Sequence, residues 1–408
     1  MRTMKLTDFI EVNPSVKLST GKEYPCVMMD EITPGRRYVF GENTKAYKGG
    51  ARFEKGDVLF ARITPCLENG KIAQFMGEGA GFGSTEYFIF REKEGISDQS
   101  YIFYLACSDI VRKPAEKSMF GASGRQRADL NVVKEVDIPA PPLDTQRKIA
   151  AVLSAYDDLI ENNTRRIQIL EEMAQAIYRQ WFVEFQYPGH ESVPLVDSGT
   201  DLNEIPQGWE VEAISNVAEV IGGGTPSTKV PEFWDDGDIN WFAPRDLTAA
   251  GTMFMSESPR KITDLGLQKS SAKMFPAYSV MMTSRATLGV TAINTLPACT
   301  NQGFITCVPS ERLSNYQIYF WISENLEKII SVASGATFKE ITKGTFRKFP
   351  IVIAPHEIHT QFVEFVAPIC KQIENLQQKN TNLRATRDLL LPRLVSGAVD
   401  VSDLPIKE

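Results

Sequence analysis

The feature that most constrains this chain is an internal duplication. Ile160-Glu161-Asn162 recurs as Ile373-Glu374-Asn375, and Leu170 and Leu383 follow the two segments at equal distances. The copies are offset by 213 residues (160 to 373, and 170 to 383). Solenoid units are only about 20–50 residues long, so this period is too long for a solenoid. It predicts two tandem copies of a globular unit, each ending in a long helix.

Two loop segments upstream of the helices also match between the copies. Arg62-Ile63-Thr64 aligns with Arg285-Ala286-Thr287, and Ser84-Thr85-Glu86-Tyr87-Phe88-Ile89 aligns roughly with Thr300-Asn301-Gln302-Gly303-Phe304-Ile305. The duplication therefore extends into the globular part of each copy.

The composition is that of an ordinary globular protein, because 43% of the 408 residues are hydrophobic and 23% are charged. A chain of this length holds two or three domains. No apolar run reaches the roughly 18–20 residues of a membrane span, and the start leads into no signal-type segment, so we expect a cytoplasmic protein. The six cysteines are scattered without a CxxC spacing, which predicts buried free thiols.

The net charge of −7 argues against nonspecific coating of nucleic acid, but local clustering of basic residues decides specific binding. Residues 112–134 hold six basic residues against two acidic ones, and residues 339–348 hold four against Glu340 alone. Both clusters lie just before the long helix of their copy. A single cluster is typical of a solvated face. Because the cluster recurs at the same place in both copies, a shared binding surface explains it as well as a solvated face does.

The sequence predicts a fold of the α+β class and divides into six segments. Short strand-like runs such as Val58–Ala61 alternate with Gly, Pro and Asn, and a helical stretch lies near residues 100–110. A breaker cluster at Ile138–Pro142 ends this part, and Asp144 is placed to cap the helix that follows. The segments are a first globular domain (1–142), a central helix (143–185), a surface linker (186–208), a second globular domain (209–355), a distal helix (356–396) and a C-terminal tail (397–408).

Both helices carry a heptad seam, with residues recurring in steps of four and three. The first seam contains Ile149, Leu153, Tyr156, Ile160, Asn163, Ile167, Leu170, Ala174, Ile177 and Trp181. The second contains Phe362, Val366, Ile369, Ile373, Leu376, Asn380, Leu383, Arg387, Leu390 and Leu394. Because such a seam is narrow, each helix must pack against a partner.

An antiparallel pairing of the two helices brings together seam positions whose numbers add to 543. Asn163 then meets Asn380, where one buried amide pair fixes the register at some cost in stability. Tyr156 would face Arg387 in a cation–π contact. A parallel in-register pairing would leave both amides unmatched. We therefore predict an antiparallel intramolecular coiled coil.

Three segments resemble catalytic or metal-binding motifs only in part. Gly222–Lys229 is glycine-rich but lacks the Gly-Lys-Ser/Thr ending of a phosphate-binding loop, so a tight turn is the better interpretation. His356 and His359 lack the glutamate and spacing of a zinc protease motif. Asn13-Pro14-Ser15-Val16 lacks the second proline and the aromatic residue of an adenine methyltransferase motif. The sequence therefore predicts no covalent chemistry.

Recognition chemistry remains. Arg62 and Thr64, like Arg285 and Thr287, follow strand-like runs where a loop would leave a sheet. Arginine reads guanine through its guanidinium fork, and threonine contacts bases or phosphates. An arginine paired with a carboxylate and a threonine in a turn explain these residues equally well. The same holds for the loops 123–127 and 334–339, which suit either phosphate contact or a flexible connection.

Several motifs of the second copy resemble the opening of a target recognition domain. They are Gly223-Gly224-Thr225-Pro226-Ser227, Phe233-Trp234, Ile239-Asn240-Trp241 and Arg245-Asp246-Leu247. Pro142–Ala150 and Leu390–Gly397 extend the resemblance over nearly the whole chain. The chain thus resembles specificity subunits of type I restriction–modification systems, with the family's order of domain, helix, domain, helix.

The resemblance implies a non-catalytic subunit that reads a bipartite double-stranded DNA target, one half-site per recognition domain. Two long helices, whose mirrored seam itself predicts a pseudo-twofold frame, would separate the domains and dock two modification (methyltransferase) subunits, and restriction subunits would complete the nuclease. No cofactor is expected on this chain, since AdoMet, ATP and Mg²⁺ would bind only to the partner subunits.

The first copy departs from the family pattern, because it has no Gly-Gly-Thr-Pro-Ser near Asn13–Thr20. It also has ten more residues between Arg62 and Asn162 than the second copy has between Arg285 and Asn375. The two domains are therefore expected to read different half-sites. The candidate DNA-binding residues are Arg62, Thr64, Ser84, Thr85, Arg125, Gln126, Arg127, Thr225, Ser227, Arg285, Thr287, Asn301, Gln302, Lys339 and Lys343.

Two other classes of function stay open. One is a methyltransferase or nuclease whose motifs have diverged. The other is a coiled-coil scaffold whose globular ends bind protein.

Overall fold

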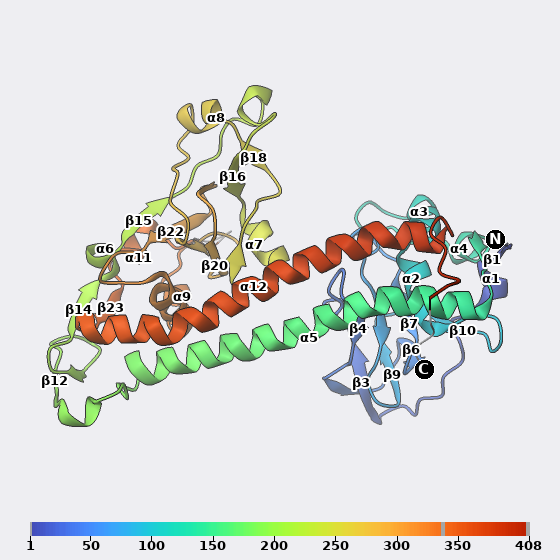
Figure 1. Ribbon diagram of the computed structural model, residues 1–408, viewed down its shortest axis with the longest axis horizontal. Coiled ribbons are helices and arrows are strands. Elements are labelled where there is room, and N and C mark those ends of the chain that lie inside the picture. Colours follow the sequence, from blue (N-terminus) through green and yellow to red (C-terminus); the bar gives the residue numbers. More distant parts are fainter. Residues whose placement is uncertain (1, 336–338, 405–408) are drawn as a thin grey trace. The chain divides into compact units, whose positions relative to one another are not determined.

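The computed structural model describes residues 2–335 and 339–404. The chain forms two compact units, of which the first comprises Met1–Asn163 with Lys379–Glu408 and the second Thr164–Gln378. Helix α5 (Leu143–Phe182) and helix α12 (His356–Val395) each contain 40 residues and contribute one half to each unit. They are the green and red helices of Figure 1. Among the described residues, no helix is both long and apolar enough to span a membrane.

The first unit is built mainly from short strands. Its strands are β1 (Thr3–Lys5), β2 (Ile10–Val12), β3 (Glu23–Val27), β4 (Tyr38–Val39), β5 (Thr44–Ala46), β6 (Ala51–Glu54), β7 (Val58–Ala61), β8 (Ile72–Phe75), β9 (Ala80–Gly83), β10 (Tyr87–Glu92) and β11 (Asp137–Pro139). Its shorter helices are α1 (Leu6–Phe9), α2 (Gln99–Cys107), α3 (Asp109–Lys117) and α4 (Leu130–Lys134). The predicted strand Val58–Ala61 is thus confirmed, and the predicted helix near 100–110 is split at Ser108.

The second unit contains a matching series of elements. Its strands are β12 (Leu195–Asp197), β13 (Glu204–Pro206), β14 (Glu210–Ala213), β15 (Glu219–Gly222), β16 (Ile239–Phe242), β17 (Phe254–Met255), β18 (Lys261–Ile262), β19 (Val280–Thr283), β20 (Thr291–Asn294), β21 (Ala298–Thr300), β22 (Phe304–Val308) and β23 (Pro350–Ile353). Its helices are α6 (Ile214–Val217), α7 (Pro244–Ala250), α8 (Asp264–Gln268), α9 (Asn315–Glu324), α10 (Leu326–Ser331) and α11 (Lys343–Phe346), with short 3₁₀ turns η1 (His190–Ser192) and η2 (Pro231–Phe233).

The two units share one topology, which confirms the duplication. The main sheet has the order β2-β10-β7-β8-β4 in the first unit and β15-β22-β19-β20-β17 in the second, with the last pair parallel in both. A two-stranded sheet, β1-β11 or β14-β23, stands next to each long helix in the sequence. The additional sheet differs, because it has four strands (β5-β3-β9-β6) in the first unit and three (β18-β16-β21) in the second.

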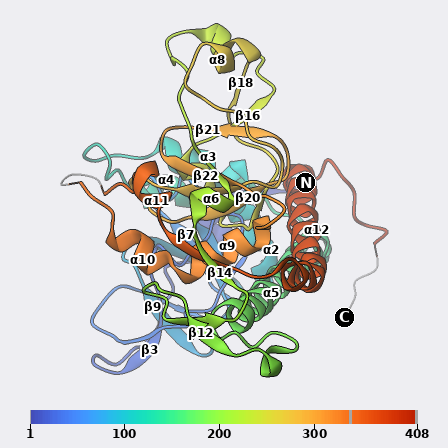
Figure 2. The ribbon, with the colours of Figure 1, turned by 90° about the vertical axis from the view of Figure 1, so that its left-hand side faces the viewer.

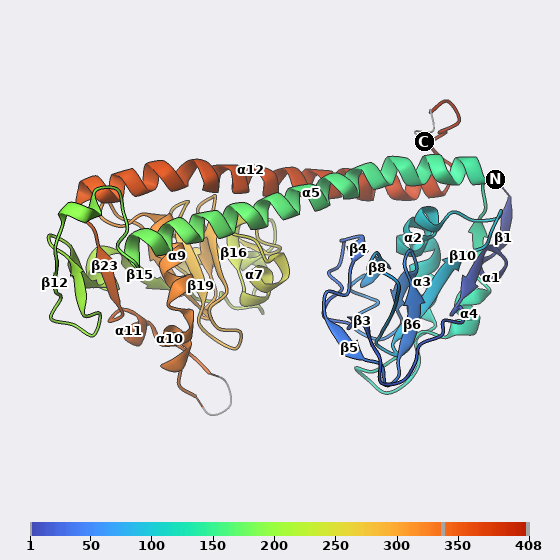
Figure 3. The same ribbon diagram turned by 90° about the horizontal axis from the view of Figure 1, so that it is seen from below.

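The core of the first unit lies between its main sheet and the helices that follow it. Helix α2 packs against β7, β8 and β10 (Figure 3). Continuous apolar runs are typical of strands buried on both faces, and all four residues of β7 and all four of β8 are buried. Tyr101, Tyr104, Phe60, Phe88 and Phe90 are each at most 1% exposed and make up much of this core. The long helix joins it through Ile149 and Leu153.

A buried side chain near the start of each long helix holds the cap of the neighbouring helix. Gln146 is fully buried, and its Oε1 accepts a hydrogen bond of 2.9 Å from the backbone N–H of Asp98, the N-cap of α2. In the second unit, His359 Nε2 accepts one of 3.1 Å from the backbone N–H of Ser314, the N-cap of α9. His359, near the start of α12, therefore has the same structural role as Gln146 near the start of α5. Asp144, predicted as a cap, instead lies in the first turn of α5.

The segment 186–208 is more structured than the predicted surface linker. It contains η1 and a small hairpin of β12 with β13. Tyr187 and Ile205 are 3% and 4% exposed and belong to the core of the second unit. The ring of Tyr187 lies 5.1 Å from that of Trp209, and this aromatic packing offsets the loss of chain entropy. In the same way, Val401 of the predicted tail is buried in the core of the first unit.

The long helices pack with the predicted antiparallel register within each unit. In the first unit, Asn163 donates a hydrogen bond of 2.9 Å to Asn380, and both side chains are at most 9% exposed. In the second, the rings of Trp181 and Phe362 lie 5.9 Å apart. The remaining seam residues are buried or half-buried: Ile149, Leu153, Ile160, Ile167, Leu170, Ile177, Val366, Ile373, Leu376, Leu383 and Leu390.

One seam contact was predicted wrongly. Arg387 does not stack on Tyr156 but forms an ion pair with Asp157, the next residue along α5, which is 3% exposed. Its guanidinium also donates to the backbone carbonyl of Gly35 at 3.0 Å. The recognition fold of the first unit covers α5 beside the seam, so an acidic residue there is buried and needs a cation.

We predict that replacing one asparagine of the buried pair destabilises the folded chain much more than replacing both. Asn163→Leu removes the donor to the buried Oδ1 of Asn380 and should lower the free energy of unfolding by about 1–3 kcal/mol. Asn163→Leu with Asn380→Leu removes both polar groups and should recover most of that loss. Denaturant midpoints of the full chain measure this.

The exposed neighbour Asn162 supplies the control, since Asn162→Leu should change the stability by no more than about 0.5 kcal/mol. Equal effects of Asn163→Leu and Asn162→Leu would show that the amide pair does not matter.

A second prediction concerns Glu171 on α5. Burial raises the pKa of Glu171 to about 7 from its usual 4.5. The folded state therefore holds this proton more tightly than the unfolded state, and the ionised form destabilises the fold as the pH rises from about 4.5 through 7. Glu171→Gln should be stabilising at pH 8 by about 1–2 kcal/mol relative to its effect at pH 5.

Thermal unfolding at the two pH values tests this, with the exposed neighbour Glu172→Gln as control. A Glu171→Gln effect that is the same at both pH values would contradict the raised pKa.

Candidate nucleic-acid interface

Three loops of the first unit meet at the end of strand β7. The backbone N–H of Arg62 donates to the carbonyl of Glu86 at 3.0 Å, which joins the loop after β7 to the loop before β10. The N–H of Thr64 donates to the carbonyl of Gln126 at 2.9 Å, which adds the loop before α4. The first-copy candidates Arg62, Thr64, Ser84, Thr85, Gln126 and Arg127 therefore lie on these joined loops.

Glu86 is the charged centre of this surface. Its carboxylate accepts from Arg127 Nη2 at 2.6 Å and Nε at 2.9 Å, and from Arg62 Nε at 3.2 Å. The hydrogen bonds from Arg127 are the main reason that the pKa of Glu86 is lowered from its usual value. Both candidate arginines are thus paired with a carboxylate, as one of the two sequence interpretations required, and the cluster still carries a net positive charge.

The other first-copy candidates differ in their surroundings. Thr64 Oγ1 donates to the sulfur of Met119 at 3.2 Å, and Ser84 Oγ accepts from the backbone N–H of Glu86 at 3.2 Å. Arg125 and Thr85 are exposed to solvent. Sequence reasoning missed Phe120, which forms a backbone bridge with Arg127 and is 63% exposed beside the basic residues. A single exposed aromatic residue gives no sequence signal of its own.

The second copy has a different register from the one that its motif suggested. The N–H of Ser284 donates to the carbonyl of Gly303 at 2.8 Å, which matches the bond from Arg62 to Glu86. Likewise, Ile341 donates to Ser284 at 2.9 Å as Ala128 donates to Arg62 at 2.8 Å. The structural counterpart of Arg62 is therefore Ser284 and not Arg285. The short motif misled by one residue because strand pairing, not residue identity, sets the register.

This register reverses the charges around the pair of loops. Gly303 replaces Glu86, and Glu340 occupies the position of Arg127. Arg285 Nε lies 3.5 Å from a carboxylate oxygen of Glu340, and the two side chains are 50% and 40% exposed. Thr287 and Lys339 are exposed nearby in the sequence, and the intervening residues 336–338 of the predicted basic loop lie outside the described residues.

The glycine-rich segment of the second copy makes a fixed turn against the end of β21. A Cβ on Gly223 would lie 2.1 Å from the carbonyl oxygen of Asn301, so only glycine fits there. Beyond the turn, Thr225 Oγ1 donates to Gln302 Oε1 at 2.5 Å. A Cβ on Gly222 would lie 3.9 Å from Lys343. The candidates Thr225, Asn301, Gln302 and Lys343 thus surround one turn.

Two tryptophans hold the backbone of this turn. Trp241 Nε1 donates to the carbonyl of Gly224 at 2.9 Å, and Trp234 Nε1 donates to the carbonyl of Ser227 at 3.0 Å. Arg260 covers the ring of Trp234 at 3.7 Å from its centroid, a cation–π distance. The tight turn predicted for Gly222–Lys229 is therefore held in place by the indole hydrogen bonds of Trp234 and Trp241.

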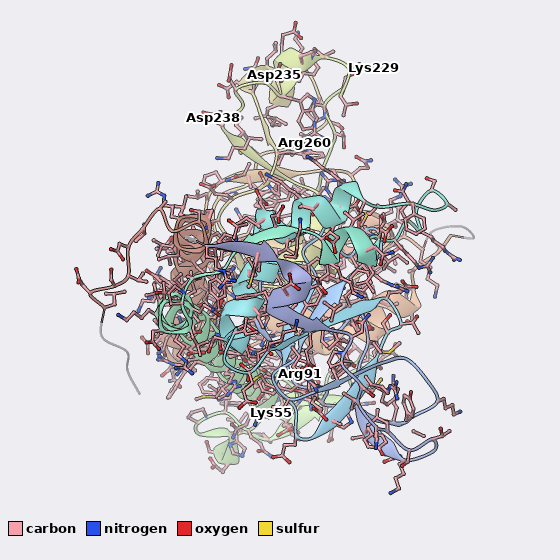
Figure 4. All side chains as sticks on the ribbon, turned by 90° about the vertical axis from the view of Figure 1, so that its right-hand side faces the viewer. Lys55, Arg91, Lys229, Asp235, Asp238 and Arg260 are labelled. Atoms are coloured by element: carbon pink, nitrogen blue, oxygen red, sulfur yellow. The ribbon has the colours of Figure 1, made fainter. Side chains whose placement is uncertain are left out.

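These tryptophans belong to a small lobe of the second unit, which consists of η2, β16, β18 and α8. Figure 2 shows β16, β18 and α8 projecting beyond β20, β21 and β22. Figure 4 places Lys229, Asp235, Asp238 and Arg260 on the same lobe. Lys229, Asp235 and Asp238 are exposed, so the lobe presents charges of both signs. Within residues 2–335 and 339–404, no cluster of His, Cys, Asp and Glu suits a metal ion.

We predict that Trp234→Phe loosens the turn while leaving the ring under Arg260. The carbonyl of Ser227 loses its indole donor, so hydrogen exchange in residues 224–230 should become faster, while the global stability falls by only about 0.5–1.5 kcal/mol. Exchange followed by mass spectrometry measures this.

Trp209→Phe, in the aromatic cluster with Phe182 and Tyr187, is the control and should leave exchange in 224–230 unchanged. Unchanged exchange in Trp234→Phe would show that the indole hydrogen bond does not order the turn.

The chain matches one protein-family description twice. The Type I restriction modification DNA specificity domain matches residues 1–172 and residues 206–385. These two ranges account for most of the chain.

Individual relatives agree with this match. The HindI specificity subunit of Haemophilus influenzae, a type I restriction enzyme component, is 25% identical over 88% of this chain and 90% of its own length. The MjaIX specificity subunit of Methanocaldococcus jannaschii is 33% identical over 44% of this chain and 42% of its own length. The crystal structure of a type I S subunit from M. genitalium has the same fold, with a TM-score of 0.55, 12% identity, and coverage of 98% of this chain and 96% of that one.

Proposed function

Because the chain belongs to the family of type I restriction–modification DNA specificity domains and carries that domain twice, we propose that it reads a two-part DNA sequence as the specificity subunit of such a system. One half-site would be read by each unit. The observation that carries the proposal is the shared topology of the two units combined with different side chains at matching loop positions. Two units with the same fold and different loop side chains suit a target whose two half-sites differ in sequence.

The chemistry of the loops supports DNA as the ligand. The first unit presents Arg62, Arg125 and Arg127, whose guanidinium groups suit base edges and phosphates. The second presents Thr225 and Gln302 on a turn held by tryptophan side chains, beside Lys343. Because the net charge of the whole chain is −7, binding would depend on these local groups and not on a general positive field.

The remaining candidates would have supporting roles. Ser84 would shape the loop before β10, and Ser227 would shape the glycine-rich turn by accepting from the N–H of Lys229 at 3.4 Å. Thr64, Thr85, Gln126, Thr287, Asn301 and Lys339 would lie at the edges of the two reading surfaces.

The chain would supply specificity and not catalysis. Its relatives are specificity subunits of restriction enzymes. We propose that two modification subunits dock on the exposed faces of α5 and α12 and bring AdoMet, and that restriction subunits with ATP and Mg²⁺ complete the nuclease. The DNA substrate would place the assembly in the cytoplasm.

The proposal predicts that a host carrying this chain and its modification subunit methylates adenine in one bipartite motif with an indifferent gap. Sequencing of methylated bases across the genome measures this. The purified chain alone should transfer no methyl group from AdoMet. Methylation by the chain alone would favour a divergent enzyme, and absence of DNA binding with and without the partner would favour a protein scaffold.

The two units supply matched variants for the same experiment. Gln302→Ala should relax one half of the motif and leave the other half intact, because Gln302 lies in the second unit only. Relaxation of both halves at once would contradict one reader per half-site.

A further inference from the structure

We propose that Arg62 reads a guanine in the half-site of the first unit, with Glu86 and Phe88 as positioning residues. The inference rests on the proposed function and names the base and the side chain that recognises it. Among the candidate arginines, Arg62 is held in one orientation from three sides.

The backbone of Arg62 is fixed by two hydrogen bonds. Its N–H donates to the carbonyl of Glu86 at 3.0 Å, and its carbonyl accepts from the N–H of Ala128 at 2.8 Å. These bonds hold Arg62 between the loop before β10 and the loop before α4. The side chain therefore starts from a defined position.

The guanidinium group is fixed on its inner edge and on one face. Nε donates to a carboxylate oxygen of Glu86 at 3.2 Å, and the group lies 5.4 Å from the centroid of the Phe88 ring. Phe88 is 1% exposed and belongs to the core, so it cannot move with the loop. The side chain of Arg62 is 32% exposed to solvent.

Glu86 is itself immobilised. Arg127 binds its carboxylate through Nε and Nη2, the two-pronged geometry that suits a carboxylate. The Glu86 side chain is only 17% exposed. A carboxylate held in this way fixes the angle at which Arg62 leaves the surface.

What remains of Arg62 is its outer edge. Within the described part of the chain, neither Nη group of Arg62 has a hydrogen-bond partner. Two parallel N–H donors in a rigid plane match O6 and N7 of guanine, which are both acceptors in the major groove. The carboxylate of Glu86 offsets part of the positive charge of Arg62, which weakens the attraction of Arg62 to a phosphate more than its hydrogen bonds to a neutral base.

The second unit lacks this arrangement. Ser284, at the matching position, is 2% exposed, and Gly303 replaces Glu86. Arg285 extends from the next position beside Glu340, half-exposed and without an aromatic ring among its contacts in the described residues. The guanine contact should therefore belong to one half-site only.

Arg62→Lys is the decisive variant, because lysine keeps the charge but lacks the planar fork. The complex of the chain with its modification subunit would be titrated with synthetic duplexes that carry the methylated motif. In the native complex, replacing the critical guanine by adenine or by 7-deazaguanine, which lacks N7, should weaken binding about 10-fold or more. In the Arg62→Lys complex, this discrimination should fall to about 2-fold, and the salt dependence of binding should stay unchanged.

Two controls separate the guanine contact from other effects. Arg52→Lys, at an exposed position of β6 in the same unit, should keep the discrimination. Glu86→Gln should reduce the discrimination while leaving the salt dependence unchanged, since it releases the angle of Arg62 without removing its charge. The position relaxed by Arg62→Lys should lie in the half-site that Gln302→Ala leaves intact.

Three results would overturn the proposal. They are a half-site of the first unit without any guanine, an Arg62→Lys complex with full discrimination, or equal weakening on all sequences with a smaller salt dependence, which would indicate a phosphate contact. If the native complex recognises no bipartite motif at all, the proposed function itself fails, and that result is obtained before any Arg62 variant is made.

Discussion

The buried hydrogen bond between Asn163 and Asn380 fixes the register of the two long helices, on which the packing within the first unit depends. Two helices of 40 residues with similar apolar seams could pair in several registers, because leucine and isoleucine pack acceptably against one another at many positions. A buried amide is tolerated only where another polar group meets it. The hydrogen bond of 2.9 Å between the two asparagines therefore selects one register and one direction. The ion pair of Asp157 with Arg387 lies two turns away and reinforces the same choice.

The register of the helices is linked to the two globular units, because each unit contains half of each helix. In the first unit the junction between the long helices and the globular part combines the apolar contacts of Ile149 and Leu153 with buried polar ones. Arg387 donates to the carbonyl of Gly35, and Tyr104 donates to Asp157 at 2.5 Å. In the second unit the junction is mainly aromatic, with Trp181, Phe182, Tyr178 and Phe362 packed together. The duplicated scaffold has thus diverged in its packing while its strand order is preserved. Each unit therefore carries loops of different chemistry on the same strand order.

The loops show how a common scaffold gives two different readers. In the first unit Glu86 orients two arginines, and in the second the carboxylate of Glu340 stands where Arg127 would be. The glycine-rich turn, with Thr225 bound to Gln302, has no counterpart in the first copy, where the sequence already lacks the motif. Ser284 is the position that matches Arg62, so the segment from this position to the helix asparagine (Asn162 or Asn375) is longer by nine residues in the first copy, and not by ten. Insertions of this size in loops have little effect on the free energy of folding, so the readers can change while the frame remains.

The sequence alone determined the features that depend on periodicity and repetition. These are the two copies, the α+β class, the long helices, their antiparallel pairing and the match of Asn163 with Asn380. Such features follow from the spacing of apolar residues, which a sequence records directly. Only the tertiary structure decided which loop residues meet. It showed that Ser284, and not Arg285, occupies the position in the second copy that matches Arg62. It also paired Arg387 with Asp157 instead of Tyr156, and it revealed a hairpin in the predicted linker. The reason is that loop contacts depend on strand register and on residues far apart in the chain, and a pairing such as that of Arg62 and Arg127 with Glu86 leaves no local pattern in the sequence.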